Sequence, residues 1–405
     1  MDARTSLRVL LDEKAVGTLR LNRNEGCEFR LLESYKLAYP RPVLGQQFLD
    51  DLEKTHRSRA RVPPWFSNLL PEGALRELVV KQTGVASTRE FFLLQRLGDD
   101  LPGAVRIVAD GDDSIEIDAD TDNSVRLSEE KDDPWHFSLA GVQLKFSALR
   151  GGRALTIPVN GQGGDWIVKL PDGRYSNVPE NEYATMQWAG AAGIDIPELA
   201  SIDLNDITGL PTNIGVFNEG LALAIRRFDR PSADRRVHME DFAQILGLYP
   251  EEKYKQYNYE TLAKLIFALT GKTGLDQFVL RLVFIILSGN GDAHHKNWSL
   301  IYPDGVNAAL SPAYDLLSTI QYMPDDKLAL NLAGTKHWQD IGMASFRRLA
   351  RKIGQEEDAM ADVVRSALAA ILDAWRMSCG DFGYDRRARE LIDKHLQSLS
   401  LLREA

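Results

Sequence analysis

Apolar-rich runs near the start of the chain predict a small α+β domain. Residues 7–11 and 16–21 are two such runs separated by a short polar stretch, which favours a β-hairpin. Residues 87–90 have the spacing of a capping box in front of a second apolar run, and Gly98 would end the helix that follows. We therefore expect an N-terminal α+β domain over residues 1–109.

The middle of the chain is rich in strand signals. Residues 165–170 and 221–228 each form an apolar run with the length of a buried strand. Between them, residues 179–193 show a helical pattern that begins with a proline, which suits a first turn, and ends with a glycine. These signals predict a strand-rich lobe over residues 135–236.

Helical patterns dominate after Val237. Residues 282–289 are mostly apolar and end at a glycine, so we expect a buried segment that delivers the polar residues after it to a cleft. A later stripe falls on one helical face and is predicted to be core: Val364, Ala367, Leu368, Ile371, Leu372 and Trp375. Residues 237–405 would then form a helical lobe, and a nucleotide would lie between the two lobes.

Negative charge is concentrated in one stretch. The 405 residues carry a formal net charge of −10, and residues 110–133 hold eleven Asp or Glu against Arg126 and Lys131, a local balance of −9. We interpret residues 110–134 as an acidic linker or a solvated hairpin. The overall balance argues against broad binding of nucleic acid or anionic membrane, although the near-neutral remainder leaves room for a local basic patch.

Cysteine usage and hydropathy indicate a cytoplasmic protein. Cys27 and Cys379 lie far apart in the sequence and suggest neither a disulfide framework nor a zinc site. The chain begins without an apolar signal core. Its most apolar run, residues 278–287, contains Arg281 and falls far short of the ~20 residues that span a bilayer. We expect no membrane contact.

The polar residues that follow Gly289 have the composition of a phosphoryl-transfer site. Asp292 and Asn297 are five positions apart, and Asp315 lies 23 residues after Asp292. Phosphoryl transfer needs one carboxylate for the attacking hydroxyl, and an amide oxygen and a second carboxylate for the metal. The alternative is an Asp- and Asn-rich turn after a buried segment, because such turns are common.

Lys169 and Glu182 extend this group of residues. Lys169 interrupts an apolar strand, where an ammonium group is costly to bury unless it is paired. It would bind the α- and β-phosphates, and Glu182 on the next helix would fix its rotamer. The alternative is that Lys169 points to water and that Glu182 is a glutamate of the kind common at helix starts. Upstream, residues 137–145 would cover the phosphates with backbone N–H groups. They match no glycine-rich phosphate motif, so a plain strand–turn–strand is the alternative.

Two further patterns do not change this picture. The Asp-Phe-Gly tripeptide at residues 381–383 resembles the metal-binding motif of protein kinases, but it lies 89 residues after Asp292. Asp315 is therefore the better candidate, and we interpret the tripeptide as an interhelical turn. His294 and His295 have no metal-ligand spacing, so a zinc site is not expected.

Taken together, these segments resemble the HipA family, the toxin kinases of bacterial toxin–antitoxin pairs, over nearly the whole chain. The order and spacing of the matching pieces carry the resemblance: residues 64–71, 138–145, 167–171, 181–183, 227–230, 292–297 and 314–315. The resemblance implies an α+β, two-lobed protein-kinase-like fold with a strand-rich N-terminal lobe and an all-helical C-terminal lobe, preceded by a small α+β subdomain. It also implies ATP and Mg²⁺ as cofactors.

The resemblance implies roles for individual residues as well. Asp292 would be the catalytic base for a Ser or Thr hydroxyl, and Asn297 and Asp315 would be the Mg²⁺ ligands. Ser138 matches the serine that such kinases autophosphorylate, and a phosphate there would add about two negative charges and expel the loop, switching the enzyme off. The residues implied at the ATP site are Ala140, Gly141, Val142, Gln143, Leu144 and Lys145 in the phosphate loop, Lys169 and Glu182, the hinge residues Arg226, Arg227 and Phe228, and His294, His295, Lys296, Asn297 and Tyr314.

The function implied is an ATP-dependent protein Ser/Thr kinase that acts as the toxin of a type II toxin–antitoxin system. It would phosphorylate itself and a translation-related protein such as an aminoacyl-tRNA synthetase, causing growth arrest or persistence. Its partner would be a helix-turn-helix antitoxin, similar to HipB, which makes most of the contact with operator DNA. Two alternatives stay open: a small-molecule phosphotransferase, because Asp292 and Asn297 also resemble the loop of aminoglycoside and choline kinases, and a non-catalytic corepressor of an antitoxin–DNA complex.

Overall fold

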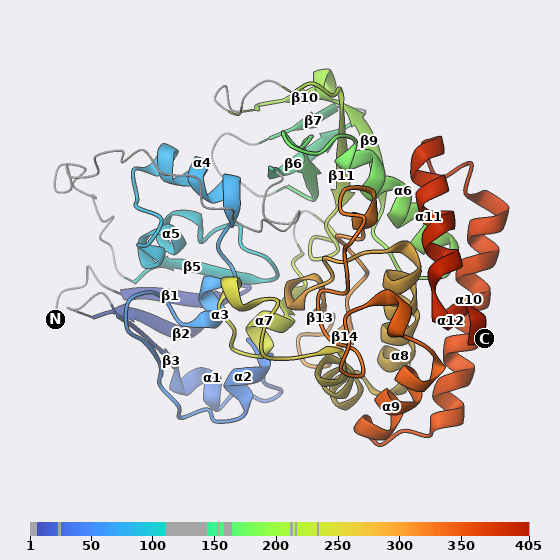
Figure 1. The fold of residues 1–405 in the computed structure, drawn as a ribbon. Coiled ribbons are helices and arrows are strands. Elements are labelled where there is room, and N and C mark those ends of the chain that lie inside the picture. The colour runs from blue at the N-terminus through green and yellow to red at the C-terminus, as the bar shows by residue number, and fades with distance from the viewer. Residues whose placement is uncertain are drawn as a thin grey trace.

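The computed structural model of the chain describes residues 6–22, 26–110, 144–152, 154–157, 164–210, 214, 217–232 and 235–404. Most of the expected acidic linker or hairpin lies outside these ranges, as do Ser138 and the phosphate-loop candidates Ala140, Gly141, Val142 and Gln143. Figure 1 shows an N-terminal domain in blue and cyan, a strand-rich lobe in green, and a helical lobe in yellow to red. We call the described residues between 6 and 110 the N-terminal domain.

The N-terminal domain is built on a five-stranded antiparallel sheet in the order β4-β3-β2-β1-β5. Its strands are β1 (Ser6–Leu11), β2 (Lys14–Leu21), β3 (Cys27–Leu31), β4 (His56–Ser58) and β5 (Val105–Ala109). Short helices pack around it: α1 (Glu33–Lys36), α2 (Gln46–Leu49), α3 (Pro64–Ser67), α4 (Gly73–Thr83) and α5 (Glu90–Leu97). The hairpin expected from the two apolar runs is confirmed as β1 and β2, and burial alternates along β1.

The helix expected before Gly98 is also present, as α5, but the predicted capping box is wrong. The N-cap is Arg89, and no side chain caps the helix. The carbonyl of Ser87 instead accepts a hydrogen bond from Arg76, and Glu90 accepts one from the Ser67 hydroxyl at 3.0 Å. The Glu90 carboxylate, which a capping box would have used, therefore has a tertiary partner instead.

The strand-rich lobe contains a six-stranded sheet in the order β10-β7-β6-β8-β11-β9, antiparallel except between β10 and β7. Its strands are β6 (Lys145–Gly151), β7 (Ala154–Thr156), β8 (Trp166–Lys169), β9 (Leu199–Asp203), β10 (Ile207–Thr208) and β11 (Leu221–Arg226). The helix α6 (Val178–Ala191) follows β8, so the two predicted strands and the helix between them are confirmed. The register pairs Lys145, the first residue of β6, with Lys169, the last residue of β8, which brings two cations to the same end of these central strands.

The helical lobe carries six α-helices in the described part of the chain. They are α7 (Phe242–Ile245), α8 (Tyr259–Ser288), α9 (Met343–Ile353), α10 (Glu357–Ser378), α11 (Arg386–Ser398) and α12 (Ser400–Glu404). Short 3-10 helices lie between the longer elements of the two lobes: η3 (Leu204–Asp206), η4 (Pro250–Glu252), η5 (His295–Asn297), η6 (Thr319–Gln321) and η7 (Trp338–Asp340). The turn between α10 and α11 contains residues 381–383, as expected.

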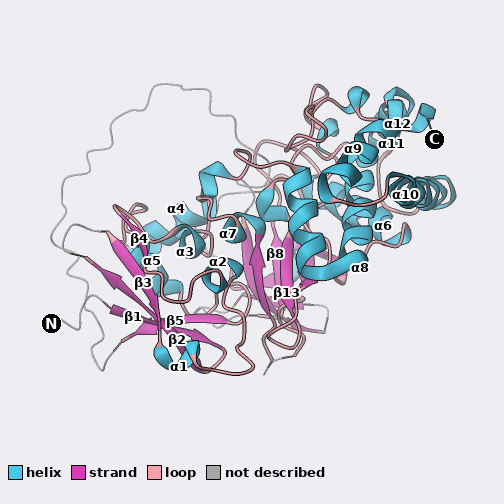
Figure 2. Cartoon of the chain, turned by 90° about the horizontal axis from the view of Figure 1, so that it is seen from below, coloured by secondary structure: helices cyan, strands magenta, loops and turns pink. Residues whose placement is uncertain are grey.

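The expectation of an all-helical C-terminal lobe needs one correction. A three-stranded sheet runs through this lobe in the order β12-β13-β14, formed by β12 (His238–Asp241), β13 (Ser299–Tyr302) and β14 (Ala309–Leu310). These strands are two to four residues long. Runs this short carry too few residues for a recognisable period-two pattern, so the sequence analysis did not predict these strands. Figure 2 shows the strands of the N-terminal domain on the left, the helices α8 to α12 on the right, and β8 and β13 between them.

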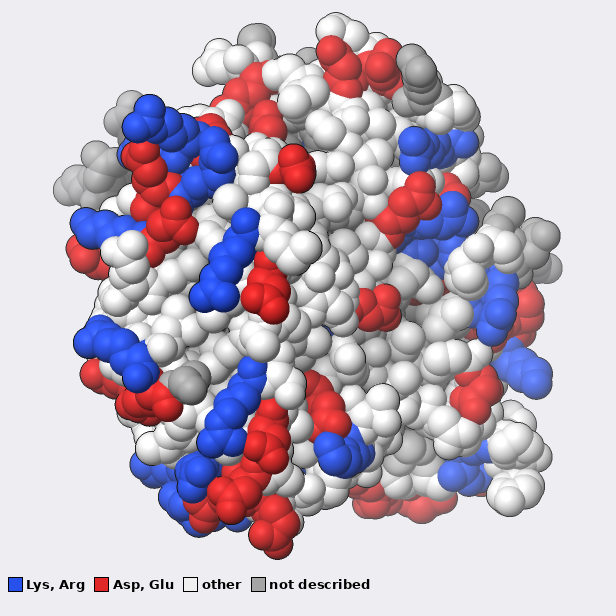
Figure 3. Space-filling view, turned by 90° about the vertical axis from the view of Figure 1, so that its right-hand side faces the viewer, with Lys and Arg blue, Asp and Glu red and all other residues white. Residues whose placement is uncertain are grey.

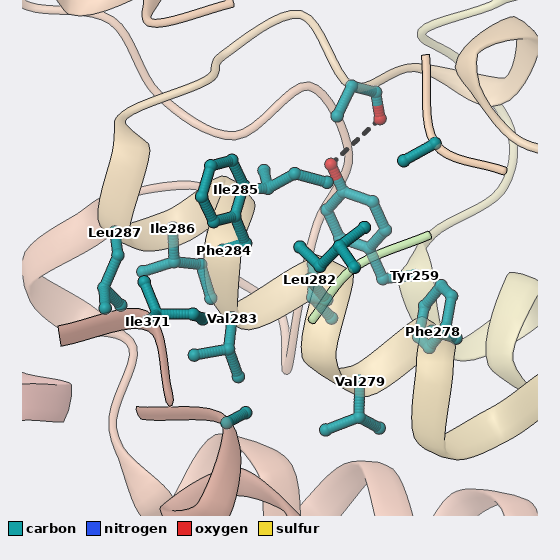
Figure 4. Close-up of a cluster of buried hydrophobic side chains, with 14 of the residues drawn as sticks. Tyr259, Phe278, Val279, Leu282, Val283, Phe284, Ile285, Ile286, Leu287 and Ile371 are labelled. Carbon is teal, nitrogen blue, oxygen red and sulfur yellow. Dashed lines mark hydrogen bonds between the residues drawn. The ribbon is translucent and has the colours of Figure 1, made fainter. Parts of the chain in front are cut away.

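The core of the helical lobe is organised around the second half of α8. Figure 4 shows its apolar residues, from Phe278 to Leu287, packed with Ile371 of α10. Trp188 of α6 contacts Phe284 and Trp375, with ring centroids 4.9 and 4.4 Å apart, so the strand-rich lobe is anchored on this core. The predicted stripe on α10 is confirmed as core, with Leu372 only partly buried. Across the described ranges, no helix combines the length and the apolar character that a bilayer crossing requires.

Glu240 joins the N-terminal domain to the helical lobe. Its carboxylate accepts hydrogen bonds from the backbone N–H of Gln46 at 2.9 Å, the indole of Trp65 at 3.1 Å and the hydroxyl of Tyr302 at 2.6 Å. The group is fully buried, and burial raises the pKa of Glu240 to about 7. The three donors satisfy a carboxyl group that would otherwise be costly to bury at this junction.

Gly289 ends α8 in the left-handed conformation, and an alanine there should destabilise the lobe. Its φ is 63°, and a Cβ atom would lie 2.6 Å from the Ile320 side chain. Gly354, which ends α9 with a φ of 72°, has no atom within 4 Å of such a Cβ. We expect Gly354→Ala to cost about 1 kcal/mol of unfolding free energy, for the backbone alone. Gly289→Ala should cost about 1–3 kcal/mol more because of the clash.

Thermal and urea unfolding of the two variants would measure this difference. Because both glycines end helices in the same conformation, the Gly354 variant isolates the backbone contribution. Equal losses of stability in the two variants would contradict the close packing of Ile320 against the end of α8.

Candidate active site

A cavity of about 340 Å³ lies where the N-terminal domain and the two lobes meet. Strands β8 and β11 form one wall, and another is formed by His294, Lys296, Asn297, Tyr314 and Asp315. Residues 68–72, in the loop between α3 and α4, form a third wall from the N-terminal domain. A polar loop is thus delivered to a cleft after Gly289, as the apolar pattern of the sequence predicted.

Most of the described candidate residues line this cavity. Those on its walls are Lys145, Lys169, Arg226, Arg227, Phe228, His294, Lys296, Asn297, Tyr314 and Asp315. Four described candidates, Leu144, Glu182, Asp292 and His295, do not form its walls. Glu182 and Asp292 each contact a residue that does: Glu182 contacts Lys169, and Asp292 contacts Asn297.

Lys169 is the electrostatic centre of the site. Its ammonium group lies 2.5 Å from Oε1 of Glu182, on α6, and also contacts Oδ1 of Asp315. Lys169 and Glu182 are both buried, with 6% and 3% of their surface exposed, so the alternative of a lysine pointing to water does not hold. One cation from the strand-rich lobe is therefore shared between α6 and the helical lobe.

The balance of burial and charge differs among these three groups. Burial disfavours the ammonium form of Lys169, but Asp315 and Glu182 outweigh it and hold the pKa of Lys169 above its usual range. Burial also opposes ionisation of Asp315, yet Lys169 and Lys145 hold the pKa of Asp315 well below its usual value. Burial raises the pKa of Glu182 against the charge of Lys169. Asp315 is thus the carboxylate that stays ionised most firmly.

Asp315 also has an unusual backbone. Its φ of 54° lies in the left-handed region, which a residue with a Cβ atom rarely adopts. Such conformations persist only where surrounding contacts hold them, and they cluster at functional sites. Here the contact with Lys169 and the neighbouring Tyr314, whose hydroxyl donates to the carbonyl of Lys296 at 2.9 Å, hold the residue in place.

Internal hydrogen bonds shape the loop around Asp292. The Asp292 N–H donates to Oδ1 of Asn290 at 2.9 Å, and Nδ2 of Asn297 donates to the Asp292 carbonyl at 3.0 Å. The hydroxyl of Tyr254 donates to Oδ1 of the Asp292 carboxylate. Asp292 is 8% exposed, so this loop is an ordered, largely buried structure rather than a solvated Asp- and Asn-rich turn.

Asn297 and Asp315 suit a Mg²⁺ ion. Because Asn297 uses its Nδ2 as a donor to Asp292, its amide oxygen is the end that remains for a cation. An amide oxygen and an ionised carboxylate are hard ligands of the type that Mg²⁺ prefers. In the ranges that the structure describes, no group of three or more His, Cys, Asp or Glu could hold a metal alone. A Mg²⁺ ion at this site would complete its shell with phosphate oxygens and water.

The backbone N–H groups of two hinge candidates are already used within the protein. The N–H groups of Arg226 and Arg227 donate to the carbonyls of Glu198 and Asp165, at 2.9 and 2.8 Å, so both are committed within the protein. The side chain of Arg227 forms a bidentate pair with Asp229, with donor–acceptor distances of 3.0 and 2.8 Å, and also reaches Asp100.

Arg227 is therefore mainly a structural residue, in spite of its place on the cavity wall. Asp229 also accepts hydrogen bonds from the N–H of Gly103 at 2.9 Å and from Arg230 at 2.7 Å. The cluster formed by Asp229, Arg227, Arg230, Asp100 and Gly103 joins the strand-rich lobe to the N-terminal domain. Phe228 remains the apolar member of the hinge, with its ring centroid 5.9 Å from that of Tyr314.

The two histidines of the loop have separate environments. His294 lines the cavity and is 2% exposed, and neither ring nitrogen has a hydrogen-bond partner among the described residues. Burial and the nearby Lys253 hold the pKa of His294 well below its usual value, so the ring is neutral. His295 instead uses Nδ1 on the carbonyl of Lys253 at 2.6 Å. His294 is thus available to a ligand in the cavity, whereas His295 serves the protein interior.

Residues that sequence reasoning missed complete the site. Glu72, in the N-terminal domain, forms ion pairs with Lys296 at 2.6 Å and with Lys253 at 3.0 Å. Burial works against its ionisation, but the two lysines hold the pKa of Glu72 well below its usual value. The only signal near it was the match of residues 64–71 to the family pattern, which says nothing about Glu72 itself.

Comparisons with known proteins place the whole chain in one family. A model of the HipA-like C-terminal domain matches residues 137–375, and a model of the HipA N-terminal domain matches residues 7–108. The chain is 42% identical to the putative kinase Y4dM of Sinorhizobium fredii, over 99% of this chain and 98% of the relative. It is 28% identical to the serine/threonine-protein kinase toxin HipA of Shewanella oneidensis, over 73% of this chain and 76% of that toxin.

A solved structure supports the fold. The Shewanella oneidensis HipA chain, determined in complex with HipB and its operator DNA, matches with a TM-score of 0.73 at 20% sequence identity. The match covers 97% of this chain and 96% of the other. At this identity the likeness establishes the shared fold, and it confirms the expected two-lobed architecture with its preceding α+β domain.

Asp241, on the cavity wall, gives a pH-dependent prediction. Burial raises the pKa of Asp241 from 3.8 to about 6, so the folded state binds a proton more tightly than the unfolded state does. Its contribution to stability is therefore greatest at low pH and is lost as the pH rises through about 6. Asp241→Asn stays neutral, so its free energy of unfolding relative to wild type should rise by about 1–2 kcal/mol between pH 5 and pH 8.

Urea unfolding of both proteins at the two pH values would test this prediction. Asp241 caps α7 by accepting a hydrogen bond from the Gln244 N–H at 2.8 Å, and asparagine can make the same bond. Asp385→Asn, at the exposed N-cap of α11, controls for the cap itself. A stability difference between Asp241→Asn and wild type that is the same at pH 5 and pH 8 would contradict the prediction.

Proposed function

The chain belongs to the HipA family, and we propose that it is an ATP-dependent protein Ser/Thr kinase whose active site is the cavity between its lobes. The observation that carries this proposal is the buried contact of Lys169 with Glu182 and Asp315, next to Asn297. A shared lysine, two carboxylates and an amide oxygen from three separate parts of the chain are what phosphoryl transfer from a nucleotide requires.

The described residues divide the work of binding the triphosphate. Lys169 would bind the α- and β-phosphates, since its ammonium group is charged, buried and held by Glu182. Asn297 and Asp315 would hold Mg²⁺, which supplies neutralisation of the charge on the phosphates. Lys296 adds a further cation to the cavity wall. Most of the catalytic effect would come from positioning and charge, because phosphoryl transfer needs little covalent chemistry from the protein.

Asp292 would act as the base toward the acceptor hydroxyl. Its carboxylate would accept the hydroxyl proton as the acceptor oxygen bonds to the γ-phosphorus, and the electron pair of the broken P–O bond would leave with ADP. The hydrogen bond from Asn297 to the Asp292 carbonyl fixes the base relative to one metal ligand.

The adenine would lie beside the hinge candidates Arg226, Arg227 and Phe228, which line the cavity. The N–H groups of Arg226 and Arg227 already donate within the protein, so adenine contacts would use other groups. Phe228, Ile225 and Ile167 line the cavity and offer apolar surface to a purine. Leu144 and Lys145 are the described end of the phosphate loop, and Lys145 lies on the cavity wall.

The proposed biological role is that of a toxin with a HipB-like helix-turn-helix antitoxin. The Shewanella oneidensis relative is named a serine/threonine-protein kinase toxin, and the matching structure holds HipA with HipB and operator DNA. Figure 3 shows that positive and negative side chains are interspersed on the face of the helical lobe that it displays. Such a face gives no continuous basic surface for DNA phosphates, which fits operator contact made mainly by the antitoxin. The proposed target is a translation-related protein such as an aminoacyl-tRNA synthetase.

Asp292→Asn should abolish most phosphoryl transfer. The change keeps the shape of the side chain but removes the base, and we expect a loss of about 10²–10⁴-fold in rate. The measurement is incubation of phosphatase-treated protein, freed of the phosphatase, with γ-labelled ATP and Mg²⁺. Mass spectrometry would locate the phosphate, which we expect on Ser138 in the wild type.

Asp381→Asn is the matched control. Asp381 opens the tripeptide that resembles a kinase motif, but it is exposed in the turn between α10 and α11, so its loss should leave the rate unchanged. Removal of Mg²⁺ with a chelator should abolish labelling in the wild type. No transfer by the wild type to itself or to added protein would overturn the proposal. Label on an aminoglycoside or choline alone would favour the small-molecule alternative.

A further inference from the structure

We infer that the N-terminal domain takes part in catalysis, by holding residues 248–254 in the position from which Tyr254 orients the carboxylate of Asp292. This inference rests on the proposed kinase function and names a positioning residue for it. We call residues 248–254 the 248–254 segment. They lie in the connection between α7 and α8 and include the 3-10 helix η4. It lies between the N-terminal domain on one side and the Asp292 loop on the other, and each side makes several polar contacts with it.

The N-terminal domain contacts the 248–254 segment along its length. Nδ2 of Asn68 donates to the carbonyl of Leu248 at 2.7 Å. The guanidinium of Arg61 stacks on the ring of Tyr249, 3.4 Å from its centroid, and forms an ion pair with Glu251.

The end of the segment is held as well. Oε2 of Glu72 lies 3.0 Å from the ammonium of Lys253, and Oε1 of the same carboxylate pairs with Lys296 of the Asp292 loop. Lys253 is buried, and removal of its partner would leave a buried charge uncompensated. The contacts from Asn68, Arg61 and Glu72 therefore fix both ends of the segment relative to the N-terminal domain.

The other side of the segment holds the Asp292 loop. The carbonyl of Lys253 accepts hydrogen bonds from the N–H of His295 at 3.2 Å and from its ring Nδ1 at 2.6 Å. The ring of Tyr254 lies edge-on to that of His294, with centroids 4.9 Å apart. The Tyr254 hydroxyl then donates to Oδ1 of Asp292. Two adjacent residues, Lys253 and Tyr254, thus fix the loop at three points, one of which is the carboxylate itself.

A hydrogen bond at this point matters because a kinase base works mainly by orienting the acceptor hydroxyl. A carboxylate can rotate about its last side-chain bond, and a fixed donor on one oxygen selects one plane for the group. A misplacement of about 1 Å at a reacting group can cost 10²-fold in rate. Tyr254 is therefore a positioning residue: it acts through Asp292 and need not touch either substrate.

Tyr254→Phe is the direct test. The change removes only the hydroxyl and keeps the ring that packs on His294. We expect kcat for labelling to fall about 10-fold, while the KM for ATP and the melting temperature stay within error of wild type. Tyr257→Phe is the matched control, because Tyr257 lies just beyond the segment, is 37% exposed and makes an edge contact between its ring and His295. Its kcat should not change.

A double-mutant cycle separates positioning from a general structural effect. If Tyr254 acts through Asp292, Tyr254→Phe should cost nothing further in an Asp292→Asn background, because the group that it positions is already lost. A loss of the same size in both backgrounds, or no loss in the wild-type background, would overturn the inference. Either result leaves the kinase proposal standing, because that proposal fails only if the wild type itself transfers no phosphate.

The contribution of the N-terminal domain needs its own variant. Arg61→Gln removes the stacking on Tyr249 and the ion pair with Glu251, and we expect a two- to five-fold fall in kcat that also disappears in the Asp292→Asn background. Arg57→Gln is the control, because Arg57 is exposed and pairs only loosely with Glu28, at 3.5 Å. An unchanged rate for Arg61→Gln, together with a loss for Tyr254→Phe, would restrict the positioning to the helical lobe and overturn the role of the N-terminal domain.

Discussion

The burial of the Lys169 ammonium is the constraint on which the rest of the site depends. An isolated charge at this depth would be very costly, so the fold must bring carboxylates to it. Glu182 comes from α6, and Asp315 comes from the far side of the cavity. The requirement to neutralise one lysine therefore fixes the strand-rich lobe, its helix and the helical lobe relative to one another. Packing of Trp188 of α6 against Phe284 of α8 and Trp375 of α10 stabilises the same arrangement of the two lobes.

A second set of buried charges brings the N-terminal domain into this arrangement. Glu72 neutralises Lys253 and Lys296. Around Asp229, the arginines of the strand-rich lobe contact the carboxylate of Asp100 and the carbonyls of Leu101 and Gly103 in the N-terminal domain. Each of these contacts is lost if the domain moves away. Lys253 and Lys296 would then lose the carboxylate of Glu72, whereas Asp229 would keep its ion pairs with Arg227 and Arg230. The cavity is thus a product of three parts of the chain, and the domain that showed no chemistry in its sequence supplies one of its walls.

Local signals were enough for part of this structure. The strand at residues 165–170 and the helix at residues 179–193 were predictable, because length, apolar character and end residues are properties of neighbouring positions. The grouping of Lys169, Glu182 and Asp315 followed from their residue types and from the family resemblance. The contact of Glu72 with Lys253 could not be predicted, because the two residues are 181 positions apart and neither lies in a recognisable motif. The short strands β12 and β14 were missed because they depend on pairing with β13 rather than on their own sequence.

The charges of the site also prepare it for its proposed ligands. Lys169 and Lys145 keep Asp315 ionised, so a Mg²⁺ ion would not have to displace a proton there. If Mg²⁺ bound to Asp315, Lys169 would have to share or give up this carboxylate, and the phosphates would replace it as the partner of Lys169. Glu182 can keep the lysine throughout, since it approaches from α6 rather than from the metal side. Because Lys169 is held between two carboxylates, it would keep a partner when nucleotide and metal bind, and no buried charge would be left unpaired.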